Sequence, residues 1–310
     1  MSNASGPTLR LGPRGSKLAL VQAHYVKSRF HQAGVDLEIV PIKTSGDKGN
    51  RDELGAFVRE IQRQILDGAV DLGLHCLKDI PTTDLPGLHF SAYLSREDPR
   101  DAILTRSGLW EDLPAGSTVG TGSLRRTSQL AAIRPDLQFK RLVGNVDTRL
   151  HKLEEGEYDA IVLAAAGLSR LGLLGEWPYE SAFPQILDTE AMVPAPGQAV
   201  LVLEARQGES HGEFLHDATV QSASTAERSF LKRFGGGCSV PVGAYASVEG
   251  DSLTLLGLVA SADGTAVFRG QIRGTASQAA SLGEELAERL GRQGGFRVVD
   301  SVLAVRLVAQ

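Results

Sequence analysis

Cysteine is scarce in this sequence, because Cys76 and Cys238 are the only two in 310 residues. Two cysteines without a CxxC spacing exclude a disulfide framework and a zinc cluster, so we expect no metal cofactor. Thiol chemistry remains open. Cys238 directly follows three glycines in the stretch FGGGCSVPVG, and glycines there either end a helix or clear space around a reactive sulfur.

Long apolar runs and an excess of positive charge are also missing. No stretch of membrane-spanning length is apolar, and the first ten residues lack the pattern of a secretory signal, so we expect a cytoplasmic protein that does not bind membranes. The formal net charge of −5 argues against nucleic acid as a partner. No glycine-rich nucleotide motif follows a strand. Basic residues that serve function must therefore be concentrated locally.

Hydrophobic periodicity predicts two α/β regions in the first two thirds of the chain. Strand and helix patterns alternate over residues 8–77 and again over 117–174, as in parallel sheets covered by helices. The first helix is expected to start after the cap Ser16 and to end at Gly34. In the second region, a strand over 158–167 is expected before a short helix.

The last third has a different pattern. Two prolines exclude a helix in the stretch 192–206, which we expect to contain a returning strand. A helix over 223–234 leads into three antiparallel strands, with turns at Gly250-Asp251 and Asp263-Gly264, and one amphipathic helix follows. These features predict a small α+β domain with Cys238 at its entrance.

Arginines stand where the predicted strands turn into helices. In the stretch GTGSLRRTSQ, a turn of small residues opens a helix, and Arg125 and Arg126 add two guanidinium groups suited to carboxylates. Arg14, Arg149 and Arg170 lie at or after equivalent turns. Each alone is typical of a solvated surface. Together, at the same ends of successive strands, they indicate a ligand with several carboxylates or phosphates.

The third strand ends in HCLKDIP, which places Lys78 and Asp79 just before Pro81. Both side chains should project into a cleft, where a carboxylate near arginines stays ionised and can stabilise a cation on a substrate. The alternative is a turn aspartate paired with Lys78. His75 lies inside the strand, which favours a core histidine over a catalytic base.

Seven motifs in order resemble the porphobilinogen deaminase (hydroxymethylbilane synthase) family over nearly the whole chain. They read RGSKLALVQA, HCLKDIPT, EDPRDA, LPAGSTVGTGSLRR, GNVDTRL, YDAIVLAAAGLSRLG and GGGCSVPVGAY. The resemblance implies three domains, two of them periplasmic-binding-protein-like α/β domains with mainly parallel mixed sheets, and a small C-terminal α+β domain with an antiparallel sheet. The implied boundaries are 1–97 with 194–213, 98–193, and 214–310.

The resemblance also implies an activity. Family members join four porphobilinogen molecules head to tail, with release of ammonia, to give the linear tetrapyrrole hydroxymethylbilane, and they are usually monomers. By resemblance, Cys238 holds a dipyrromethane cofactor through a thioether and Asp79 is the catalytic residue. The remaining positions divide into cofactor-binding Lys78, Thr121, Ser123, Arg125, Arg126, Asn145 and Arg149, and substrate-binding Arg14, Ser16, Arg170 and Gln198.

Two positions depart from the family pattern. Leu54 stands where a loop lysine is usual, and Val143 stands where an arginine usually precedes the GN pair. Arg141, two residues earlier on the same strand face, is a candidate to replace that arginine.

Two other functions fit parts of the sequence. A binding protein of the periplasmic type would use the same two-lobed cleft for a small anion without chemistry. A divergent homologue would assemble the cofactor and elongate poorly, because basic contacts have been lost.

Overall fold

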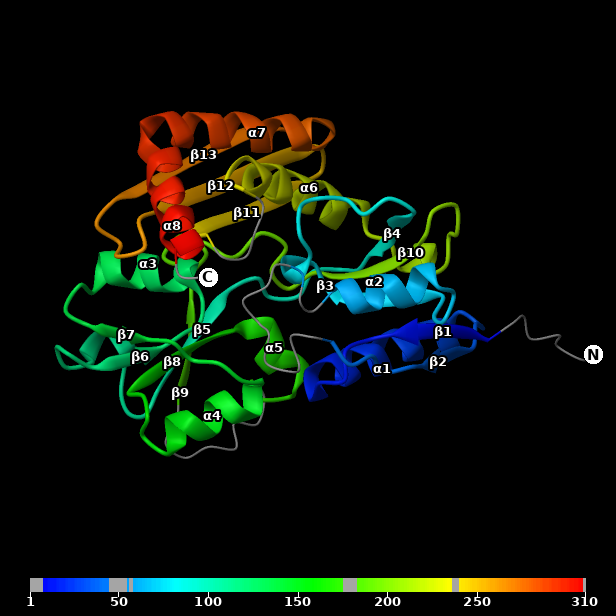
Figure 1. Ribbon diagram of the computed structural model, residues 1–310, viewed down its shortest axis with the longest axis horizontal. Coiled ribbons are helices and arrows are strands. Elements are labelled where there is room, and N and C mark those ends of the chain that lie inside the picture. The colour runs from blue at the N-terminus through cyan, green and yellow to red at the C-terminus, as the bar shows by residue number, and fades with distance from the viewer. Residues whose placement is uncertain (1–7, 45–54, 56–57, 175–182, 236–239, 309–310) are drawn as a thin grey trace, which may run out of the picture. The chain divides into compact units, whose positions relative to one another are not determined.

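The first α/β sheet is built from residues before 97 and a strand that returns after 200. The structure is a computed structural model, and it describes residues 8–44, 55, 58–174, 183–235 and 240–308 (Figure 1). The elements of this sheet are β1 (Leu9–Gly12), α1 (Lys17–Gln32), β2 (Leu37–Ile39), α2 (Arg59–Leu66), β3 (Leu72–Cys76), the short helix η1 (Leu77–Asp79), β4 (Leu88–Tyr93) and β10 (Leu201–Arg206). The strand order is β2-β1-β3-β10-β4, with β10 antiparallel to both neighbours.

Helix α1 forms where the periodicity predicts it. Ala23, Val26 and Phe30 recur at helical spacing, are buried, and join the core formed with the strands. The Ser16 hydroxyl accepts a hydrogen bond from the Ala19 N–H at 3.4 Å, which confirms Ser16 as the N-cap. Gly34 has a φ of 76°, which favours glycine just beyond the helix end.

A second sheet of the same design follows. Its elements are β5 (Asp101–Thr105), η2 (Trp110–Asp112), β6 (Thr118–Gly120), α3 (Leu124–Ile133), β7 (Gln138–Lys140), α4 (Val146–Glu154), β8 (Ala160–Ala164), α5 (Ala165–Arg170) and β9 (Phe183–Leu187). The order is β7-β6-β8-β5-β9, and β5 is antiparallel to both neighbours. Each sheet thus holds three adjacent parallel strands, then an antiparallel strand and an edge strand. The mixed, mainly parallel character expected for both is confirmed.

The third sheet is antiparallel throughout its three strands. The elements are α6 (Ala218–Arg233), β11 (Val242–Glu249), β12 (Ser252–Ala260), β13 (Val267–Thr275), η4 (Ala276–Gln278), α7 (Ala279–Leu290), the π-helical turn η5 (Gly291–Gly295) and α8 (Phe296–Val308). Figure 1 shows α7 lying along this sheet. The two turns fall at Gly250-Asp251 and Asp263-Gly264, as expected.

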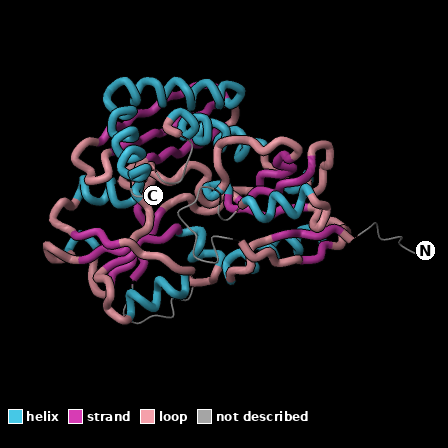
Figure 2. The backbone as a smooth tube through the Cα atoms, in the orientation of Figure 1, coloured by secondary structure: helices cyan, strands magenta, loops and turns pink. Residues whose placement is uncertain are grey.

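Predicted boundaries are wrong in two places. Helix α6 begins at Ala218, five residues before the expected start at residue 223. The strand expected over 158–167 ends at Ala164, and α5 begins at Ala165, three residues before the expected helix. Alanine has the strongest helix propensity, so the AAAG stretch turns helical once the chain leaves the sheet. Figure 2, coloured by secondary structure, also shows strands and a final helix that periodicity did not predict, namely β4, β5, β9 and α8.

The chain divides into two compact units. One comprises Met1–Glu97 and Val200–Gln221, and the other comprises Asp98–Ala199 and Ser222–Gln310. The second α/β sheet and the antiparallel sheet therefore belong to one unit, and a finer division into three domains stays a prediction. Among the described residues, no helix is both long and apolar enough to span a bilayer.

Candidate functional site

In the first unit, the predicted residues gather at one edge of the sheet. Strands β1 and β3 are parallel neighbours, so the turns after them lie side by side. Arg14 and Ser16 follow β1, while Lys78 and Asp79 form the end of η1 after β3. Lys78 and Asp79 are both half-buried.

Backbone bonds fix the turn that carries Asp79. The Leu77 N–H donates to the Val200 carbonyl at 3.0 Å, and the Ile80 N–H closes the turn on the Leu77 carbonyl at 3.1 Å. Leu77 is fully buried. The catalytic candidate is therefore presented by a short, anchored helical turn rather than by a long loop.

His75 is a core residue, as its place in the strand predicted. Its Nε2 lies 3.0 Å from Glu204 Oε2 on β10, and both side chains are buried. This is an ion-pair distance, although the angle is not that of a hydrogen bond. Gln62 donates to the other Glu204 oxygen at 2.9 Å. The histidine thus joins neighbouring elements and does not face a ligand site.

In the second unit, the basic turns follow three adjacent parallel strands, in the order β7-β6-β8. Ser123 and Asn145 are the N-cap residues of α3 and α4, and neither side chain makes a capping hydrogen bond. Thr121 accepts a hydrogen bond from the Ser123 N–H at 3.2 Å. Gly144 has a φ of 127°, a conformation that requires glycine before α4. Helix starts without side-chain caps are suited to anions.

Two of the predicted arginines are tethered to the backbone. Arg149 Nε donates to the Gly144 carbonyl at 2.9 Å, and Arg170 Nη2 donates to the Ala199 carbonyl at 2.7 Å. Both side chains are half-buried. Because each bond fixes the guanidinium plane, these arginines are oriented before a ligand arrives.

Arg125 and Arg126 are buried, and both pair with a residue that the sequence did not single out. Asp101 is 0% exposed, and it lies 2.7 Å from Arg125 Nη1 and 2.7 Å from Arg126 Nη2. Burial alone would raise the pKa of Asp101, but the charges and hydrogen bonds of the two arginines outweigh it and hold that pKa far below its usual range. The motif EDPRDA contains this acid, yet nothing local indicates that its partners stand more than twenty residues away.

Gln198 has no exposed surface, although the resemblance implies contact with substrate. Its amide donates to the Pro99 carbonyl at 2.7 Å and to Asp101 Oδ1 at 2.9 Å. A contact with substrate would require this side chain to leave that network.

The departures from the family pattern are only partly visible. Leu54, one of the two departures, lies outside the described residues, and so does Cys238, the predicted cofactor attachment residue. Val143 is 43% exposed, Arg141 is exposed, and Leu142 between them is buried. Arg141 and Val143 are therefore both exposed, but β7 ends at Lys140, so the strand that was expected to give them a common face does not reach them.

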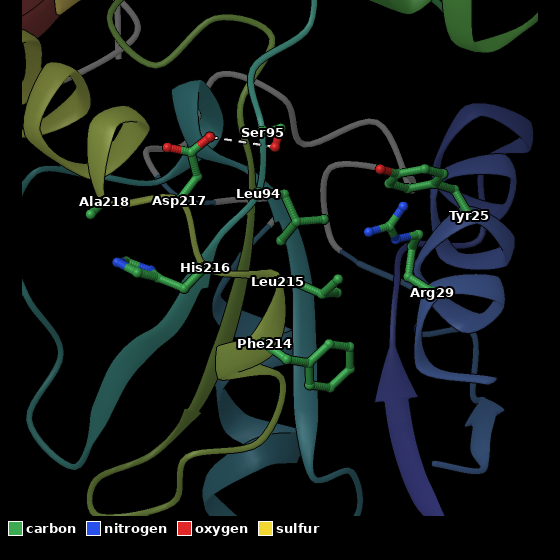
Figure 3. A pocket seen from close by; sticks show the side chains of 9 residues that line it. All are labelled: Tyr25, Arg29, Leu94, Ser95, Phe214, Leu215, His216, Asp217 and Ala218. Atoms are coloured by element: carbon green, nitrogen blue, oxygen red, sulfur yellow. Dashed lines mark hydrogen bonds between the residues drawn. The ribbon is translucent and has the colours of Figure 1, made fainter. Parts of the chain in front are cut away.

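A separate hollow of about 360 Å³ lies in the first unit (Figure 3). Tyr25 and Arg29 project from α1, and Phe214 points toward them from the short helix η3 (Glu213–Leu215). Other lining groups serve the local fold, because His216 Nδ1 accepts the Tyr93 N–H and Asp217 accepts N–H groups at the start of α6. None of the predicted site residues lines this hollow.

Fold and site together define an α/β protein whose basic, helix-starting turns are suited to a small polycarboxylate. A family model described as "Porphobilinogen deaminase, dipyromethane cofactor binding domain" matches residues 9–213, and one for the C-terminal domain matches 222–292. The chain therefore belongs to the porphobilinogen deaminase family, the hydroxymethylbilane synthases, which are transferases of tetrapyrrole biosynthesis with a dipyrromethane cofactor.

Similar proteins extend over nearly the full length. The porphobilinogen deaminase of Trichlorobacter lovleyi is 42% identical, with 95% of this chain and 96% of that protein covered. The one from Roseiflexus castenholzii is 45% identical, with 93% and 97% covered. Among solved structures, the methionine-binding protein MetQ is 12% identical with a TM-score of 0.41, and 67% of this chain and 86% of MetQ are covered.

Proposed function

We propose that Asp79 and Cys238 carry the chemistry of this hydroxymethylbilane synthase, and that its basic turns bind the acetate and propionate groups of porphobilinogen and the growing chain. The supporting observation is the clustering of predicted residues after adjacent parallel strands in each sheet. Four condensations on one protein accumulate many carboxylates. Several fixed cations on a chain of net charge −5 match that requirement.

Asp79 acts on the substrate cation. When the aminomethyl carbon of porphobilinogen loses ammonia, the nitrogen leaves with the bonding electrons, and positive charge spreads from the methylene carbon onto the pyrrole nitrogen. A carboxylate held beside that N–H stabilises the charge as it develops. The anchored turn that carries Asp79 supports this role, because its backbone is fixed by hydrogen bonds before a substrate binds.

The second unit fits the carboxylates of a dipyrromethane group. Arg125 Nε is buried and has no hydrogen-bond partner among the described residues, a state that costs free energy until an acceptor arrives. The starts of α3 and α4 lack side-chain caps. When bound, dipyrromethane supplies the pyrrole end from which the chain grows. Arg125, Arg149 and the two helix starts would hold its carboxylates.

The role of Cys238 rests on sequence and family membership. Its thiolate would form the thioether to the cofactor, and the preceding glycines leave room for a bulky group. Intact mass spectrometry tests this directly. The wild-type protein, made in a host that supplies porphobilinogen, is expected to carry two added pyrrole units, and Cys238→Ser is expected to carry none. An unmodified wild-type chain would contradict the assignment.

Turnover of porphobilinogen tests Asp79 and separates an active enzyme from a divergent homologue. Asp79→Ala should keep its circular dichroism spectrum and its added mass but lose elongation by about a hundredfold or more, because a positioned charge and proton acceptor is gone. If the wild type carries the added mass yet turns over no faster than Asp79→Ala, the chain is the divergent homologue.

We further propose that the enzyme works as a monomer in the cytoplasm on a freely diffusing substrate. Family membership supports this. Light scattering of the purified protein tests the monomeric state.

A further inference from the structure

Asp101 occupies the centre of a buried ion cluster at the start of β5. Its Oδ2 accepts from Arg125 Nη1 at 2.7 Å, and its Oδ1 accepts from Arg126 Nη2 at 2.7 Å and Nε at 3.1 Å. Gln198 donates a further bond to Oδ1 at 2.9 Å. An acid so placed stays ionised, because both arginines lower its pKa more than burial raises it. One aspartate therefore neutralises one of two buried cations.

The remaining donors of the two arginines are unequal. Arg126 uses Nε and Nη2 on Asp101 and Nη1 on the Val162 carbonyl at 2.9 Å. Arg125 uses Nη1 for both Asp101 and the Val193 carbonyl, while its Nε stays without a partner in the described chain. All three nitrogens of Arg126 are thus bonded to the protein, whereas the hydrogen bonds of Arg125 to described residues all run through Nη1, so its Nε and Nη2 edge is left for one carboxylate.

The Val193 carbonyl that shares Arg125 Nη1 is itself held in place. Gln129 donates to this carbonyl at 3.1 Å and accepts the Val193 N–H at 2.7 Å. Arg125 is therefore fixed through Nη1 by two anchored acceptors. Its Nε direction follows from that fixation, since the guanidinium group is planar and rigid.

We propose that Asp101 is a positioning residue that limits this arginine pair to one bound carboxylate of the ligand. It leaves the pair with one net positive charge and with Arg125 as the arginine that contacts ligand, while Arg126 serves to hold Asp101. The inference rests on the proposed function, because it specifies how one part of that site binds pyrrole carboxylates.

The first test measures anion binding and needs no turnover. Removing the charge with Asp101→Asn leaves two buried cations. In the full chain carrying Cys238→Ser, which is expected to hold no cofactor carboxylates at this site, inorganic phosphate titrated calorimetrically should bind about tenfold tighter after Asp101→Asn than before it. All phosphate comparisons are made in this background. Asp98→Asn is the matched control, because Asp98 lies three residues from Asp101 and also pairs with an arginine, Arg100. Equal phosphate affinity with and without Asp101→Asn, or an equal gain in Asp98→Asn, would overturn the proposal.

The second test covers the case in which Asp101→Asn does not fold. The double variant Asp101→Asn/Arg126→Gln removes one cation with its counter-ion, so the net charge of the cluster stays at one. Its phosphate affinity should equal that of the parent chain with Asp101 and Arg126 intact, whereas Arg125→Gln alone should lower the phosphate affinity about tenfold or more. A double variant as impaired as Arg125→Gln would show that Arg126 also binds ligand. A wild type without turnover would instead contradict the proposed function, and the phosphate comparison would still stand.

Discussion

At the residue scale, the charged side chains divide into those that hold the fold and those that are oriented for a ligand. Sequence placed Arg125, Arg126 and Gln198 in the second group, and the structure shows all three bonded to Asp101. Arg149 and Arg170 each make one backbone hydrogen bond and remain half-buried. A cation near a sheet edge is therefore not automatically a ligand contact, because a buried carboxylate can take up its donors first.

Arg141 provides a test at this scale. It is exposed, as is Val143, which stands where the family has an arginine. If Arg141 replaces that missing charge, Arg141→Ala should raise KM for porphobilinogen about three- to tenfold with little change in kcat, as expected for one partly solvated carboxylate contact. Val143→Arg should lower KM in the Arg141→Ala background. Unchanged chain elongation in Arg141→Ala would show that the hypothesis is wrong.

At the element scale, helices α6 and α7 approach each other closely at a glycine. A Cβ at Gly283 of α7 would lie 2.3 Å from the Ala226 carbonyl oxygen of α6 and 2.8 Å from the Ser229 Cβ. The first neighbour is backbone and cannot rotate away. The two helices thus approach at a distance that only glycine allows.

Gly283→Ala should therefore be destabilising despite the better helix propensity of alanine. Overpacking at a rigid contact is expected to cost about 1–3 kcal/mol, against a propensity gain of at most about 1 kcal/mol. The midpoint of urea unfolding, followed by circular dichroism, measures the net effect. Glu285→Ala, on the exposed side of the same helix, is the control and should shift the midpoint little. A more stable Gly283→Ala protein would contradict the packing argument.

Elements with a clear period were predictable, and those without one were not. Helix α1 shows buried residues at helical spacing and a cap, and the strands β11 to β13 are separated by glycine turns. Strand β5 was missed because it begins at Asp101 inside a charged motif, and its five residues are all buried, so they show no alternation. Helix α8 was missed because its sequence, FRVVDSVLAVRLV, is rich in β-branched residues that favour strands.

At the scale of the whole molecule, several aspartates pair with arginines that lower their pKa values, and Asp71 and Asp101 do so with arginines far away in the chain. Burial would raise the pKa of Asp71, but hydrogen bonds from Arg10 outweigh it and lower that pKa. A hydrogen bond from Arg100 lowers the pKa of Asp98, and Asp101 is shifted in the same direction. Depressed carboxylate pKa values stabilise the folded state above the unfolded pKa of about 3.9, and this stabilisation is lost as pH falls through the folded values.

The urea midpoint should therefore change little between about pH 7 and pH 5 on account of these groups and fall steeply below about pH 4. Circular dichroism at matched ionic strength measures it. Asp71→Asn, which removes one such carboxylate outside the proposed site, should be less stable at neutral pH and should show a shallower acid loss. A midpoint that is equally high at about pH 3 and pH 7 would contradict the assignment.

The sequence by itself determined the class of fold and the family, and it predicted the residues with reactive chemistry. Local periodicity, capping residues and glycine turns suffice for the elements, and seven ordered motifs suffice for the family. Only the tertiary structure decided which cations keep a free donor. That outcome depends on Asp101, Arg125, Arg126 and Gln198 meeting in one buried cluster, and contacts between residues so far apart in the chain leave no local pattern to read.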